Sequence, residues 1–134
     1  MKKLFIELFG TYFLVLIIGL SSGNPIAVGF GLMVLVYCGA HISGAHYNPA
    51  VTLAMFLQKE ISALDSIKYF ISQVLGSTLA ALSIYLMKSN MLVQPVLGDS
   101  IYSIFFSEII FTLLLVFVIL NVATHPKQKG NSFY

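Results

Sequence analysis

The 134-residue sequence contains no tryptophan and no arginine, and only 9% of its residues are charged. A soluble domain carries about 25% charged residues, so an ordinary water-soluble globular protein is excluded. Seven lysines and five carboxylates leave a net charge of +2, which is too small and too dispersed for a nucleic-acid-binding surface. The single cysteine, Cys38, excludes an internal disulfide framework and a CxxC metal or redox site.

Hydrophobic residues make up 58% of the chain, and the 51 residues between Glu7 and Lys59 include no Asp, Glu, Lys or Arg. One transmembrane helix needs about 20 apolar residues, so this stretch holds more than one membrane element. The sequence therefore predicts an all-α membrane protein in a lipid bilayer. Its apolar runs predict four membrane-spanning helices, at about residues 4–20, 26–40, 66–87 and 101–123.

The first apolar segment also has the basic start and the length of a cleaved signal peptide. Glu7 within that segment argues against this alternative. The pattern Glu-x-x-x-Thr-x-x-Leu-Val begins at Glu7 and recurs from Glu108, 101 residues later. Many transport proteins are built from such repeats, so we expect the first segment to be retained as a helix.

A short helix is predicted between the second and third spans. Asn48 is a preferred N-cap residue and Pro49 suits the first helical position, so the helix begins at Pro49. Residues 49–57 would extend for about 13.5 Å, which is under half of a hydrocarbon core of about 30 Å. The sequence therefore predicts half of a membrane helix.

The lysines indicate how this segment lies in the membrane. If residues 41–57 enter and leave on the same side, six lysines lie on one side and only Lys88 on the other. If they cross, the lysines divide three to four, which is no bias. Positive charge accumulates on the cytoplasmic side, so we expect a re-entrant half helix and cytoplasmic termini. Lysine-flanked spans without a disulfide suit a bacterial inner membrane.

Residues 43–47 predict a water-filled passage, because irregular backbone at membrane depth is tolerated only inside protein or beside a wet cavity. Gly44 and Ala45 place no bulky side chain on this backbone, so its carbonyl groups can accept hydrogen bonds. Asn48 offers amide donors at the positive N-terminus of the half helix. A passage lined by these groups is expected to repel cations and protons and to admit neutral molecules.

Other interpretations of these residues are weaker. Asn-Pro alone is typical of turns. His41 and His46 lack the spacing and companions of a metal site or a membrane enzyme, so neither a metal nor catalysis is expected. An isolated carboxylate in a span tends to face the bundle interior, where Glu7 and Glu108 could accept N–H groups of an irregular loop. The alternative, more plausible for Glu7, is a position near the interface within reach of water.

Small residues recur every fourth position in the third span, at Ser72, Gly76 and Ala80, and favour close approach of helices. Gln73, beside this face, could form hydrogen bonds across helices. Three tyrosines near span ends are expected as interfacial aromatics: Tyr69, Tyr85 and Tyr102.

The segment 43–52, Ser-Gly-Ala-His-Tyr-Asn-Pro-Ala-Val-Thr, closely resembles the first Asn-Pro-Ala signature of the aquaporin and glycerol-facilitator (major intrinsic protein) family. The segments at Glu7, Gln73 and Glu108 resemble the family's first, third and fourth helices. The resemblance implies a right-handed helical bundle, here with four transmembrane helices and one re-entrant half helix. It further implies passive conduction of water, or of small neutral solutes such as glycerol, by a homotetramer without a cofactor.

The resemblance also implies roles for individual residues. Asn48 would donate to the passing molecule, while Pro49 and Ala50 would pack the half helix against its counterpart. The pore carbonyls would belong to Gly44, Ala45 and His46, and Glu7 and Glu108 would hold the two pore loops. Val28 falls at the family's selectivity constriction, where a small residue suggests a wider or unusual filter.

By this resemblance, residues 1–87 form a first repeat, 88–100 an extracellular loop, 101–123 the first span of a second repeat, and 124–134 a cytoplasmic tail. A second Asn-Pro-Ala, its arginine and two further spans are missing. We therefore expect a fragment of a longer channel. The alternative is a half-channel subunit that assembles with another aquaporin-like chain.

Overall fold

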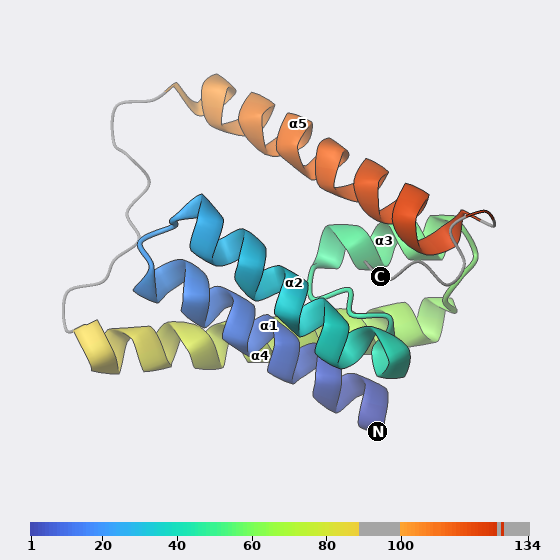
Figure 1. Ribbon diagram of the computed structural model, residues 1–134, viewed down its shortest axis with the longest axis horizontal. Helices are drawn as coiled ribbons and strands as arrows, with labels where there is room; N and C mark the ends of the chain where they lie inside the picture. Colours follow the sequence, from blue (N-terminus) through green and yellow to red (C-terminus); the bar gives the residue numbers. More distant parts are fainter. Residues whose placement is uncertain (89–99, 126, 128–134) are drawn as a thin grey trace. The chain divides into compact units, whose positions relative to one another are not determined.

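The computed structural model describes residues 1–88, 100–125 and 127 (Figure 1). Within these residues the secondary structure is wholly helical, and four helices are long and apolar enough to cross a membrane, as predicted. The chain divides into two compact units, Met1–Val93 and Gln94–Tyr134. The elements are α1 (Lys2–Leu20), α2 (Pro25–Ser43), α3 (Pro49–Leu57), α4 (Ala63–Lys88), α5 (Ile101–Ile119) and the π-helical turn η1 (Leu120–Thr124).

Local capping explains where α2 begins and ends. Asn24 accepts hydrogen bonds from the backbone N–H groups of Ile26 (3.0 Å) and Ala27 (3.1 Å), and proline occupies the first turn. The helix continues to Ser43, beyond the predicted end near Ala40, because Gly44 supplies a left-handed C-cap with φ of +89°. The irregular segment therefore begins at Gly44, one residue later than expected, and His41 is helical.

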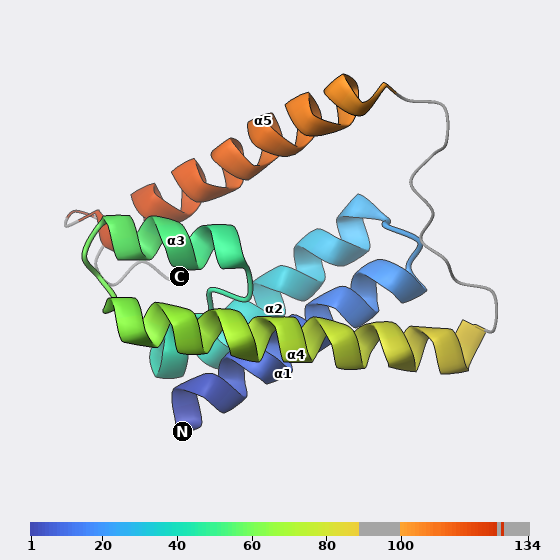
Figure 2. The ribbon, with the colours of Figure 1, turned by 180° about the vertical axis from the view of Figure 1, so that it is seen from behind.

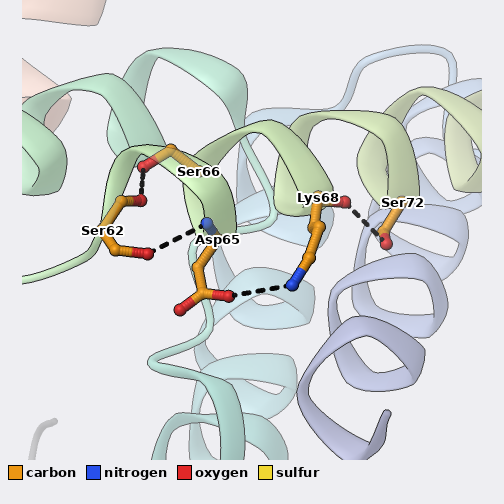
Figure 3. A network of polar contacts seen from close by, with 5 residues as sticks. All are labelled: Ser62, Asp65, Ser66, Lys68 and Ser72. Carbon is orange, nitrogen blue, oxygen red and sulfur yellow. Dashed lines mark hydrogen bonds and ion pairs between the residues drawn. The ribbon is translucent and has the colours of Figure 1, made fainter.

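The start of α4 is organised by Ser62 (Figure 3). Its hydroxyl oxygen accepts a hydrogen bond from the Asp65 backbone N–H at 3.1 Å, which satisfies one of the free donors of the first turn. Its carbonyl oxygen accepts from the Ser66 hydroxyl at 2.9 Å. Asp65 also forms an ion pair with Lys68, with 3.6 Å between Oδ1 and Nζ. An acidic side chain in this turn complements the helix dipole.

The two helices α1 and α4 pack side by side in the first unit (Figure 2). Gly76 permits this contact, because a Cβ at that position would overlap the backbone carbonyl oxygen of Leu8. Ser72 and Ala80 are buried on the same face of α4, as the spacing of small residues predicted. Gly19 of α1 meets the side chain of Ile84 further along.

Lys88 joins the far ends of these helices and provides a first test of the packing. Its ammonium donates to the carbonyl oxygens of Leu20 (2.9 Å) and Gly19 (3.3 Å) at the C-terminus of α1. Lys88→Met should lower the free energy of unfolding in detergent micelles by about 1 kcal/mol, because these carbonyls lose a charged donor. Lys59→Met, at an exposed turn, is the control and should leave the free energy unchanged. Equal losses in both variants would contradict the bridging role.

The second unit contains α5, whose start is capped by the Ser100 hydroxyl, which accepts from the Tyr102 N–H at 3.3 Å. The helix continues through η1 to Thr124, close to the predicted span 101–123. Glu108 lies on α5 with an exposed side chain. Most of the predicted loop 88–100 and of the tail 124–134 lies outside the described residues.

Candidate functional site

An irregular five-residue segment, residues 44–48, connects α2 to the short helix α3. Its backbone enters the left-handed region at Gly44, Ala45 (φ +49°) and Tyr47 (φ +47°). This conformation costs a non-glycine residue about 1–2 kcal/mol, so contacts elsewhere must hold the segment. Ala45 and Tyr47 are both buried, at 6% and 4% exposure.

Glu7 of α1 supplies the main contacts to this segment. Its Oε1 accepts hydrogen bonds from the Ser43 hydroxyl (2.7 Å) and the His46 backbone N–H (3.0 Å). Its Oε2 accepts from the Tyr47 backbone N–H (2.8 Å) and the Gln73 amide (2.9 Å). These four donors match the acceptor sites of a carboxylate. Glu7 has 0% exposure, so the alternative of a water-reached interface position is wrong for this residue.

A threonine on α3 extends this buried network. Thr52 Oγ1 accepts a hydrogen bond from Gln73 Nε2 at 2.9 Å and donates to the Asn48 carbonyl oxygen at 3.2 Å. With its hydroxyl hydrogen used in this way, Thr52 accepts from His46 Nδ1, which lies 3.1 Å away. Gln73 therefore bonds across helices, as the sequence suggested, and links α4 to both α1 and α3.

Tyr69 departs from its predicted place among interfacial aromatics. It is 2% exposed, its hydroxyl donates to the Ser43 carbonyl oxygen at 2.7 Å, and its ring packs edge-on against His46 with 5.1 Å between centroids. The prediction was wrong because Tyr69 faces the last residue of α2 and the irregular segment that follows it, not the lipid headgroups. Tyr85 and Tyr102 are exposed.

Tyr47 was not singled out by the sequence, yet its ring lies between two glycines on different helices. A Cβ at Gly10 of α1 or at Gly39 of α2 would overlap the tyrosine ring or its hydroxyl. The hydroxyl also donates to the Leu35 carbonyl oxygen at 3.0 Å. The signal in the sequence was the presence of glycines inside predicted helices. Glycine destabilises a helix interior, so its presence there indicates that another group packs closely against the backbone.

Asn48 and the loop carbonyls carry the polar groups of the site. Asn48 Oδ1 accepts from the Ala50 N–H at 2.7 Å as the N-cap of α3, which begins at Pro49. In the described part of the chain, no protein group accepts from Asn48 Nδ2, and none donates to the carbonyl oxygens of Ala45 and His46. A donor and two acceptors therefore remain available to a small polar molecule.

Two predicted site residues lie away from this segment. Val28 is in the first turn of α2, about 22 Å along that helix from Ser43 at 1.5 Å per residue. Glu108 belongs to the second unit, so its assignment to a pore loop stays a prediction. His41 is exposed in the last turn of α2.

A comparison of the chain with protein families identifies the family to which it belongs. The family model described as "Major intrinsic protein" matches residues 1–133. The chain belongs to the major intrinsic protein family. It is thus a membrane protein of a channel family.

Individual relatives agree with this assignment. Over 147 aligned positions the chain is 35% identical to glycerol uptake facilitator protein-like 6 of Lactiplantibacillus plantarum, covering 98% of this chain and 67% of that protein. Over 158 positions it is 37% identical to aquaporin NIP1-2 of Arabidopsis thaliana, covering 97% and 52%. Nodulin-26 of Glycine max is 34% identical over 147 positions, covering 97% and 54%. The chain therefore spans about half to two thirds of the length of these relatives.

Proposed function

We propose that this chain contributes the first pore loop and half helix of a passive channel for water and for small neutral solutes such as glycerol. The observation that carries the proposal is the irregular segment 44–48, held in a left-handed backbone by the buried carboxylate of Glu7. The carbonyl oxygens of Ala45 and His46 and the Asn48 amide offer a passing molecule hydrogen bonds that replace those it makes in water. The names of the relatives, aquaporin and glycerol uptake facilitator, support the same substrates.

Proton exclusion is part of this proposal, and the start of α3 supports it. The N-terminus of a helix carries a partial positive charge, and Asn48 adds amide donors there. A water molecule that accepts from this amide presents its hydrogens away from it, which interrupts a chain of hydrogen bonds. Cations meet the same positive end and are repelled.

Further roles are proposed with this channel. Pro49 and Ala50 pack against a second half helix, Glu108 holds the matching loop, and Val28 borders a wide constriction. The complete channel is a homotetramer with cytoplasmic termini in a bacterial inner membrane, and it catalyses no reaction.

Substituting Asn48 tests the electrostatic part of this proposal. Asn48→Asp keeps an N-cap acceptor but adds a negative charge at the positive N-terminus of α3. Cation and proton flux should rise by at least about tenfold, since a unit charge 4 Å away contributes about 4 kcal/mol at an effective dielectric of 20. The measurement is dye-reported proton flux and stopped-flow water flux in proteoliposomes that contain the complete channel. Asn24→Asp, the same change at the exposed N-cap of α2, is the control. Unchanged proton flux in Asn48→Asp, with water flux intact, would contradict the assignment.

A half-channel subunit is the second candidate, because α3 exposes apolar side chains. Leu53, Phe56 and Leu57 are 57%, 38% and 70% exposed. Under this alternative, vesicles containing the protein alone conduct water no faster than empty ones, and adding a second aquaporin-like chain restores flow. Fast flow through the protein alone would eliminate it.

A further inference from the structure

An apolar groove lies where the start of α1 meets the end of α2, the two blue and teal ends near the N label in Figure 1. Its volume is about 350 Å³, and it is lined by Met1, Lys2, Phe5, Ile6 and Ile42. Phe5 is 61% exposed, so the groove opens outward. Both helices are candidate membrane spans, which places these ends near the boundary between hydrocarbon and headgroups.

One cation lines this groove, and a second follows it in the sequence; neither has an opposing charge in the described part of the chain. Lys2 borders it and Lys3 follows, and both are exposed and have no ion-pair partner in the described part of the chain. Lys68, by contrast, pairs with Asp65 (Figure 3). The carboxylate of Glu7, one turn further along α1, is buried and already accepts four hydrogen bonds.

We propose that this groove binds one anionic phospholipid, with an acyl chain against Phe5, Ile6 and Ile42 and the phosphate beside Lys2 and Lys3. Charge complementarity selects this occupant over a neutral lipid. Any lipid can bury an acyl chain in the groove, but only a net negative headgroup compensates two unpaired ammonium groups. Lysine stems lie along apolar surface while the charged ends reach the headgroups, which suits this geometry.

Lipid binding to the purified protein tests the proposal. Native mass spectrometry would titrate the protein with phosphatidylglycerol and with phosphatidylcholine of the same acyl chains. We expect tighter binding of phosphatidylglycerol, and the variant Lys2→Gln/Lys3→Gln should weaken it by about 30-fold. The control, Lys59→Gln/Lys68→Gln, removes the same charge away from the groove and should change binding less than twofold.

A second variant tests the apolar part. Ile42→Trp fills the groove without changing charge, and it should weaken phosphatidylglycerol binding while circular dichroism still reports the native helix content. Three results would overturn the proposal: equal binding of the two lipids, equal weakening by the two lysine pairs, or normal binding in a folded Ile42→Trp variant. Equal binding of the two lipids would indicate that the groove recognises only the acyl chain. Equal weakening by the two lysine pairs would indicate that only the net charge of the protein matters. Water flux is not the readout, so failure here does not bear on the channel.

Discussion

Glu7→Gln should lower the free energy of unfolding by about 3 kcal/mol, because it leaves buried donors around the irregular segment 44–48 without an acceptor. The amide nitrogen would replace one carboxylate oxygen, and each oxygen now accepts two hydrogen bonds. Whichever way the amide turns, an N–H group then faces two donors. The left-handed backbone at Ala45 and Tyr47 loses its main restraint at the same time.

The measurement is unfolding in mixed micelles followed by circular dichroism, together with water flux in proteoliposomes that contain the complete channel. Flux should fall even where Glu7→Gln still folds, because the loop carbonyls are no longer held in one arrangement. Glu60→Gln is the matched control, since Glu60 is exposed after α3, and it should change stability by less than about 0.5 kcal/mol. If the two variants unfold at the same midpoint, Glu7 does not hold the loop.

Gly76→Leu should have an effect of similar size through packing alone. The backbone of α4 at Gly76 lies against the Leu8 carbonyl of α1, and backbone cannot move aside as a flexible side chain can. The helices must separate, and this displaces Gln73, one turn earlier on α4, from Glu7. We expect a loss of about 3 kcal/mol or more, and about 1–3 kcal/mol for the smaller change Gly76→Ala.

Gly29 offers a matched control for Gly76. It lies within α2, and a Cβ there would meet no atom within 4 Å. Gly29→Ala should leave stability unchanged or raise it by up to about 1 kcal/mol, since alanine favours the helix. Thermal unfolding of the four proteins, wild type included, in one detergent separates these effects. A similar loss in Gly29→Ala and Gly76→Ala would show that close packing of α1 and α4 is not the cause.

Much of the architecture was predictable, because local chemistry decides it. Apolar runs of about 20 residues predicted the four spans, and α3 covers the nine residues expected after the Asn48-Pro49 pair. An N-cap side chain and a proline at the first helical position act within three residues of each other, so no tertiary context is needed to recognise them. Resemblance over the same segment also predicted the family.

The partners inside the bundle were less predictable. Gln73 was expected to bond across helices, but the sequence did not say to what; it bonds to Glu7, 66 residues away. Tyr69 was expected at the interface and is instead buried against the end of α2, 26 residues from its acceptor. Nothing in the local sequence distinguishes a tyrosine that faces lipid from one that faces a neighbouring helix.

From the sequence alone came the membrane class, the four spans, the half helix and the family, since each depends on hydrophobicity or capping over neighbouring residues. Only the tertiary structure decided that Glu7 is fully buried, that Tyr47 lies between Gly10 and Gly39, and that Gly76 meets the backbone of α1. These features depend on side chains that folding brings together from distant positions. A buried polar group is stable only when its donors and acceptors are matched. The packing of the helices therefore determined which residues form hydrogen bonds to the irregular segment.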